Sequence, residues 1–129
     1  MVVATNTKGG YGEPSLPGYY TKISQAFIKF LSLVGPTKTY KPKITFDGAN
    51  GVGAPAMKEF NKMLADVLAV EIVNAGEGEL NYGCGADYVK TTQAAPVGQA
   101  LSVGQRWVSV DGDADRIVYY FASEKVWLL

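Results

Sequence analysis

Residues 43–73 read KITFDGANGVGAPAMKEFNKMLADVLAVEIV, and their pattern sets the fold class of the chain. The first four residues predict a short buried strand, and residues 47–54 form a Gly-rich turn. Apolar side chains then recur at helical spacing, at Met57, Phe60, Met63, Leu64, Val67 and Leu68. Residues 70–73 predict a second strand. This order of strand, helix and strand is typical of an α/β fold.

Further elements are expected on both sides of this segment. Residues 20–34 predict an amphipathic helix that ends at Gly35-Pro36. Residues 106–110 and 117–121 predict two more strands. Aromatic side chains in the strand runs are expected in the core, at Trp107, Tyr119, Tyr120, Phe121 and Trp127.

The two ends of the chain carry different signals. Residues 1–18 show no apolar period and are expected to be a flexible linker or N-terminal extension, leaving residues 19–129 as the folded domain. Residues 74–85 are too rich in Gly and Asn to predict regular structure. Residues 126–129 predict another strand if the chain continues, and their apolar character suggests a domain excised from a longer protein.

The composition excludes several classes of function. Lys+Arg and Asp+Glu each number 12 among 129 residues, so no basic surface indicates nucleic acid or a membrane as a partner. The absence of histidine excludes a His general base and a zinc site built on imidazole. A single cysteine, Cys84, rules out an internal disulfide, and without a signal-like N-terminus or a membrane-length apolar run we expect a cytoplasmic protein.

The acidic segment at residues 111–116, DGDADR, is the strongest functional signal. Asp111, Asp113 and Asp115 alternate between two predicted strands, so a slight curl of the loop can aim all three carboxylates at one point. At about 6 Å and an effective dielectric near 20, each pair of charges repels by roughly 2 to 3 kcal/mol. A hard cation relieves this repulsion, and a short cage of three carboxylates favours Mg²⁺. The planar fork of Arg116 suits a phosphate or a pair of sugar hydroxyls.

The acidic segment is compatible with two other interpretations. A calcium loop of the EF-hand kind requires Gly at its sixth position and Glu at its twelfth, where this chain has Arg116 and Ala122. A solvated acidic turn between strands needs only the turn preference of Asp and Gly, but it does not require three acids in phase.

Glycines elsewhere suggest weaker hypotheses. Residues 51–56, GVGAPA, approach a dinucleotide fingerprint, but the acid expected at the end of the next strand is replaced by Glu71 early in that strand. The same glycines also serve a sharp turn in which Asp47 or Asn50 caps free amides. Residues 81–90 form either a ligand loop or a structural turn. Without a histidine to activate it, Cys84 is predicted to be a packed side chain rather than a nucleophile.

Three segments together resemble a known family. They are Asp47–Gly53, Leu80-Asn81 with Cys84–Lys90, and Asp111–Tyr119. In this order they resemble the eukaryotic phosphoacetylglucosamine mutases of the α-D-phosphohexomutase superfamily, from about Gly18 to the C-terminus. The resemblance implies a single phosphohexomutase-type domain with a mixed β-sheet sandwiched between helices, the second and metal-binding domain of four.

The resemblance also implies roles for single residues. Asp111, Asp113 and Asp115 match the family's Mg²⁺ ligands, and Arg116 matches a catalytic arginine near the phosphoserine. The family interconverts N-acetylglucosamine 6-phosphate and 1-phosphate through that phosphoserine, in carbohydrate metabolism on the route to UDP-N-acetylglucosamine.

Three of the family's motifs are absent from this chain: the Ser-His-Asn, Glu-x-Ser-Gly and Arg-x-Ser-Gly-Thr loops. We therefore expect the isolated chain to be inactive and to work only with the other domains of the same polypeptide and their phosphosugar substrate. The alternative that the residues leave open is a non-catalytic α/β module, either metal-stabilised or dinucleotide-binding.

Overall fold

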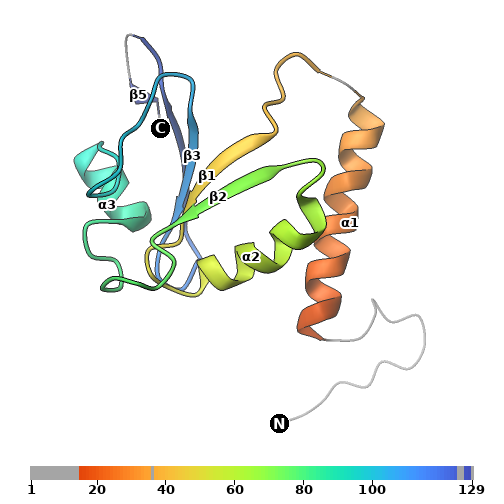
Figure 1. Cartoon of the computed structure of the whole chain (residues 1–129), viewed down its shortest axis with the longest axis horizontal. Coiled ribbons are helices and arrows are strands. Elements are labelled where there is room, and N and C mark those ends of the chain that lie inside the picture. Colours follow the sequence, from red (N-terminus) through yellow and green to blue (C-terminus); the bar gives the residue numbers. More distant parts are fainter. Residues whose placement is uncertain (1–14, 36, 125–126, 129) are drawn as a thin grey trace.

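A mixed five-stranded sheet forms the centre of the protein (Figure 1). The computed structural model describes residues 15–35, 37–124 and 127–128. The strands are β1 (Lys43–Asp47), β2 (Ala69–Val73), β3 (Arg106–Val110), β4 (Ile117–Ala122) and β5 (Trp127–Leu128), in the spatial order β2-β1-β3-β4-β5. β1 pairs in parallel with β2 and β3, whereas β3–β4 and β4–β5 are antiparallel. The predicted strands are confirmed to within one residue at the ends that the structure describes.

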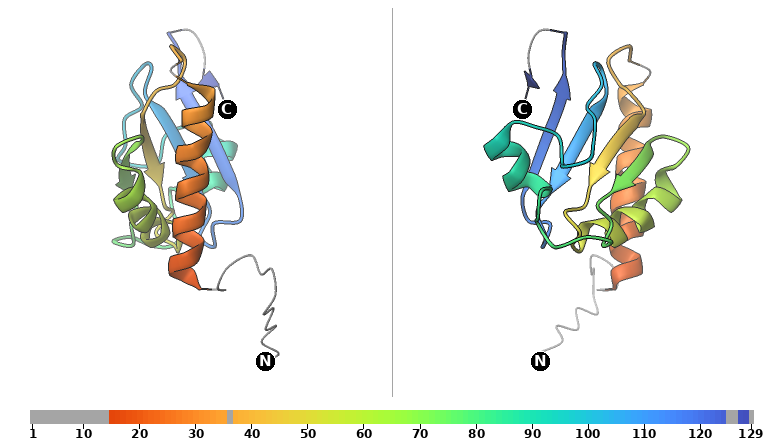
Figure 2. Two further views of the ribbon diagram at one scale, coloured as in Figure 1. Left: turned by 90° about the vertical axis from the view of Figure 1, so that its right-hand side faces the viewer. Right: turned by 60° about the vertical axis from the view of Figure 1, so that its left-hand side comes forward.

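Helices cover both faces of this sheet, as the fold class predicted. α1 (Leu16–Val34) and α2 (Gly53–Leu64) lie on one face and α3 (Gly85–Thr92) on the other (Figure 2). On the first face Met57 of α2 packs against Phe46, Val108 and Val110. On the second face Val89 of α3 packs with Trp107 and Tyr120. Alternate side chains of β3 therefore belong to two separate apolar clusters, one on each face of the sheet.

The predicted first helix is present but begins earlier than expected. Ser15 caps it, because its Oγ accepts a hydrogen bond from the Gly18 N–H at 3.1 Å, and Pro17 fits the first turn. The expected linker therefore ends before Gly18, and residues 1–14 lie outside the described residues. At the other end Gly35 adopts φ 73°, and its N–H donates to the Leu31 carbonyl at 3.0 Å.

α3 was not predicted, since a helix of 8 residues with three buried positions gives little periodic signal. It starts at Gly85, which the sequence placed in an irregular loop. Gly85 has φ +88°, and a Cβ there would lie 2.9 Å from the Ala49 Cβ. Only glycine fits this junction, and the same glycine that suggested a loop therefore allows the helix to begin.

The aromatic residues divide between core and surface. Trp107 and Tyr120 are 1% and 0% exposed, as predicted, but Tyr119 is 43% exposed because it lies on the opposite face of β4, where it borders a cavity. Phe121 is half-buried, and the side chain of Trp127 lies outside the described residues. α2 ends at Leu64, before Val67 and Leu68, and Met63 is 40% exposed. None of the described helices is long and apolar enough to cross a membrane.

Candidate metal centre

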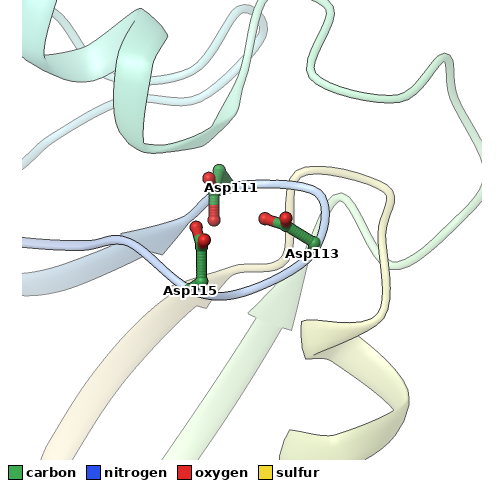
Figure 3. A group of neighbouring side chains, drawn as sticks. All are labelled: Asp111, Asp113 and Asp115. Atoms are coloured by element: carbon green, nitrogen blue, oxygen red, sulfur yellow. The ribbon is translucent and has the colours of Figure 1, made fainter.

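The acidic loop is the hairpin connection between β3 and β4. Its closing bonds are those from the Asp111 N–H to the Arg116 carbonyl, at 3.3 Å, and from the Ala114 N–H to the Asp111 carbonyl, at 3.0 Å. Ala114 takes a left-handed conformation with φ 60°, which curls the loop as the alternating acids require. Figure 3 shows the three carboxylates facing one another, and their nearest oxygen atoms all lie within 4.8 Å.

The carboxylates differ in burial and in proton affinity. Asp111 is buried, whereas Asp113 and Asp115 are exposed. Burial alone would raise the pKa of Asp111, but hydrogen bonds from the side chain and backbone of Arg116 outweigh it and hold this pKa at about 2. A hydrogen bond with Asp111 and the charges of Asp113 and Asp111 raise the pKa of Asp115. Asp111 is thus ionised at neutral pH, and the cluster favours a cation.

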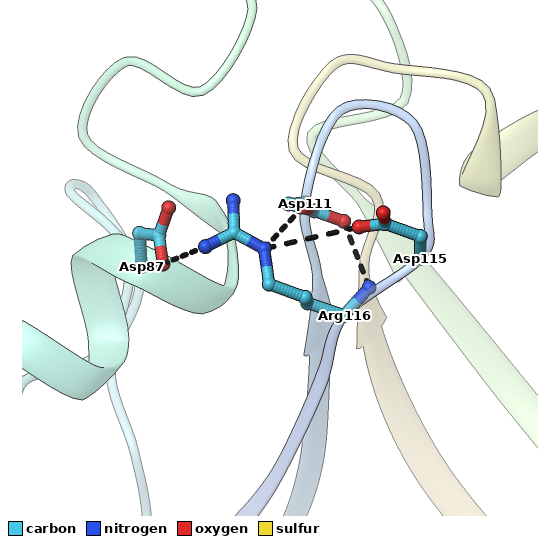
Figure 4. Close-up of polar contacts among 4 residues, drawn as sticks. All are labelled: Asp87, Asp111, Asp115 and Arg116. Carbon is cyan, nitrogen blue, oxygen red and sulfur yellow. Dashed lines mark hydrogen bonds and ion pairs between the residues drawn. The ribbon is translucent and has the colours of Figure 1, made fainter.

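Arg116 is held between the acidic loop and α3 (Figure 4). Its Nε lies 2.7 Å from the Asp111 Oδ2 and 3.8 Å from the Asp115 Oδ1, and its Nη1 lies 2.7 Å from the Asp87 Oδ1. The hydrogen bond to Asp111 and the charge of Asp87 raise the pKa of the guanidinium. Its Nη2 donates no hydrogen bond to the described residues, and 59% of the side chain is exposed. One arm of the fork therefore remains available to an anion.

The Gly-rich turn after β1 braces the acidic loop from the other side. The Val52 N–H donates to the Gly112 carbonyl at 3.0 Å. A Cβ on Gly51 would lie 2.1 Å from that carbonyl oxygen, and one on Gly53 would lie 2.7 Å from the Val110 Cγ2. Protein atoms thus occupy the space beside both glycines of the suspected dinucleotide fingerprint. Close packing explains why these two positions are glycine, without a nucleotide.

Asp47 ties the elements around the site together. This carboxylate is fully buried and accepts four hydrogen bonds. The donors are Ala49 N at 3.0 Å, Asn74 Nδ2 at 2.9 Å, Gly85 N at 2.7 Å and Ser109 Oγ at 2.7 Å. Asp47 thus satisfies a free amide of the turn, that of Ala49, but it does not cap α2, whose N-terminus has no side-chain cap. It also anchors the start of α3, which carries Asp87. The other expected cap, Asn50, accepts instead from Gly76 and Gly78.

Cys84 lies immediately before α3 and is 4% exposed. Burial, followed by the charge of Asp47, raises the pKa of its thiol. A protonated, buried thiol is a poor nucleophile, which agrees with the predicted packing role.

The donor set fits Mg²⁺. Octahedral ligands lie about 2.1 Å from Mg²⁺, so neighbouring oxygens are about 3 Å apart and opposite ones about 4.2 Å apart. The three carboxylate oxygens lie within 4.8 Å of one another, so they must come closer together to bind one ion. Asp113 and Asp115 are exposed, which leaves room for their side chains to change rotamer.

Comparison with known proteins agrees with this geometry. The family model described as "Phosphoacetylglucosamine mutase AMG1, domain II" matches residues 16–118. The chain belongs to this family.

Related phosphoacetylglucosamine mutases are much longer than this chain. The pig protein (Sus scrofa) is 42% identical over 94% of the chain and 22% of its own length. The second phosphoacetylglucosamine mutase of Schizosaccharomyces pombe is 41% identical over 100% of the chain and 24% of its own length. A solved structure of Aspergillus fumigatus N-acetylphosphoglucosamine mutase, in complex with GlcNAc-6P and magnesium, is 44% identical with a TM-score of 0.81. The match covers 97% of the present chain and 26% of the Aspergillus fumigatus chain.

The candidate metal centre contains four residues that the sequence predicted and three supporting residues that it did not. The structure brings Asp111, Asp113, Asp115 and Arg116 together in one loop. Asp87, Asp47 and Gly51 were not assigned to the site. Asp87 gave a partial signal, as the one acid in a segment that suggested a ligand loop.

Proposed function

We propose that this chain is the Mg²⁺-binding domain of a phosphoacetylglucosamine mutase, an isomerase that interconverts N-acetylglucosamine 6-phosphate and N-acetylglucosamine 1-phosphate. The observation that carries the proposal is the convergence of three carboxylates within 4.8 Å, next to Arg116, whose Nη2 has no hydrogen-bond partner in the part of the chain that the structure describes. The Aspergillus fumigatus relative, solved with GlcNAc-6P and magnesium, supports it.

Each residue of the site has a distinct role in this proposal. Asp111, Asp113 and Asp115 hold the ion, which when bound neutralises charge on the phosphoryl group. Arg116 directs its Nη2 at a phosphate oxygen. Asp87 and Asp111 fix the guanidinium from two sides, each at 2.7 Å, so that the fork is oriented before the substrate arrives.

The remaining parts of the active site lie in other domains of the same polypeptide. The phosphoserine and the loops that bind sugar and phosphate are absent from this sequence. We place the folded domain from Leu16 onward, and we expect the enzyme to act in the cytoplasm on the route to UDP-N-acetylglucosamine.

A magnesium titration tests the proposed site directly. With only three protein ligands, we expect millimolar affinity, corresponding to roughly 4 kcal/mol. Amide NMR shifts of residues 111–116 should saturate with Mg²⁺ in the parent chain and in Asp66→Asn, which changes an exposed acid beyond the end of α2. Asp113→Asn should lose the response. A response that is unchanged in Asp113→Asn would place the ion elsewhere.

An activity assay separates the mutase from a non-catalytic, metal-stabilised module. The isolated chain should show no turnover of N-acetylglucosamine 6-phosphate with a bisphosphate activator. In the full-length protein, Asp113→Asn should abolish turnover while the protein remains folded. If full-length turnover survives this change, the loop has no catalytic role.

A further inference from the structure

α1 carries a row of large apolar side chains that the described residues leave uncovered. Leu16, Ile23 and Phe30 recur every seventh residue and are 65%, 48% and 60% exposed. Tyr19 and Val34 lie beside them and are also more than half exposed. Helical geometry places these five residues on one side of α1, which we call the α1 surface. Soluble monomers seldom expose so continuous an apolar patch.

The α1 surface meets the side of α1 that packs on α2 at Tyr19, whose ring centroid lies 5.9 Å from that of Phe60. That packing uses Tyr20, whose ring centroid lies 4.9 Å from that of Phe60, and Ser24, which is 1% exposed. The side of the helix that carries Lys22, Gln25 and Lys29 is polar and exposed. α1 thus has one apolar side that packs within the domain and a second that, apart from Tyr19, is not covered by the described residues.

A group of cations lies at one end of the sheet and meets α1 at Phe27, one helical turn from Ile23 of the α1 surface. A cavity next to it is lined by Phe27, Tyr40, Lys41, Lys43, Arg106 and Tyr119, among other residues, and by no carboxylate. The three cations form no ion pair with any described residue. The Arg106 Nε is buried and has no hydrogen-bond partner among the described residues. A complementary surface would be apolar with carboxylates along this border.

We propose that the α1 surface docks onto a neighbouring domain of the same, longer polypeptide, whose facing side is apolar with an acidic border. This inference rests on the proposed function, in which the chain is one domain of a larger enzyme. The matched relatives are about four times longer, since the chain spans only 22–26% of their lengths. A permanently attached neighbour would keep this apolar surface out of water, whereas a transient partner would leave it exposed much of the time.

A second copy of the chain fits this surface less well. A two-fold dimer requires a self-complementary patch. The cavity beside the α1 surface offers three cations and no carboxylate, so two copies would bring like charges together without partners.

Thiol labelling measures whether the α1 surface is covered. Phe30→Cys places a thiol on it, and Gln25→Cys places one about 140° away around the helix. Cys84, which is 4% exposed, serves as a slow internal reference. In the full-length protein Phe30→Cys should react roughly 100-fold more slowly than in the 129-residue chain, because labelling there requires the interface to open. Gln25→Cys should react at the same rate in both.

Each other outcome overturns the proposal. Equal rates for Phe30→Cys in the two proteins mean that no domain covers the surface. A rate that falls with the concentration of the 129-residue chain, together with dimers in sedimentation, assigns the surface to a second copy. Lys43→Glu should speed labelling of Phe30→Cys in the full-length protein, because it places a negative charge against the proposed acidic border. An unchanged labelling rate would contradict that border. The readout does not involve Mg²⁺, so it fails or succeeds independently of the metal site.

Discussion

Replacement of Asp47 should have the largest effect on stability of any single polar change near the site. Its carboxylate is 0% exposed and accepts four hydrogen bonds, from β1's own turn, from the loop after β2, from the start of α3 and from β3. Asp47→Ala removes all four acceptor positions at once. The loss therefore affects three parts of the chain outside β1 and its turn.

The size of the effect follows from what happens to the four donors. The backbone N–H groups of Ala49 and Gly85 are buried and have no other acceptor among the described residues, and an unsatisfied buried donor costs about 1–3 kcal/mol. Ser109 keeps the Tyr120 hydroxyl as a partner at 3.0 Å, and Asn74 is only partly buried, so they add little. We expect a loss of about 4 kcal/mol, a large share of the roughly 5–15 kcal/mol of a typical domain.

Urea unfolding followed by circular dichroism measures this loss. Asp66→Ala is the matched control, because Asp66 is exposed and should change stability by no more than about 0.5 kcal/mol. Asp47→Asn keeps the shape and one acceptor oxygen, so it should cost about half as much as Asp47→Ala. A difference below about 1 kcal/mol between Asp47→Ala and the parent chain would refute the role given to this carboxylate.

Three further changes test the acidic loop. Gly51→Ala forces a Cβ to 2.1 Å from the Gly112 carbonyl oxygen, so we expect a loss of up to about 3 kcal/mol in urea and weaker Mg²⁺ binding in the NMR titration; normal values for both would contradict the bracing contact. The pKa of Asp111 lies at about 2, below its ordinary 3.8, so its ionised form stabilises the fold above pH about 4 and this contribution is lost as the pH falls toward 2. Asp111→Asn should therefore flatten the acid limb of a stability-against-pH curve, and an unchanged limb would assign it to other acids. Arg116→Lys in the full-length enzyme should lower kcat roughly 100-fold, about 3 kcal/mol, with little change in Tm; lower stability with normal turnover would make Arg116 structural.

The sequence predicted those parts of the fold whose signals are local. Residues 106–110 form β3 as expected, and the periodic apolar residues after Tyr20 lie in α1. The acidic loop was also predictable, because alternation in a hairpin brings its carboxylates together without help from distant residues. The start of α1 was placed too late, since the cap provided by Ser15 lies among residues that resemble a linker.

Contacts between distant segments could not be predicted in the same way. The approach of Gly51 to Gly112 depends on the parallel pairing of β1 with β3, which no local pattern specifies. The same pairing brings Ser109 to Asp47, and α3 then supplies Asp87 to Arg116. Asp87 lies in a helix with little apolar periodicity, and its role depends on an arginine 29 positions later in the chain.

All three carboxylates of the candidate metal centre come from five consecutive residues, Asp111–Asp115, in one turn between paired strands. Bringing them together closes only a short loop, so little chain entropy is lost beyond that of the hairpin itself. The orientation of Arg116, by contrast, depends on α3. We therefore expect the acidic turn to keep its cation affinity when it is grafted onto another two-stranded hairpin. Arg116 would lose its orientation there, because α3 would be absent.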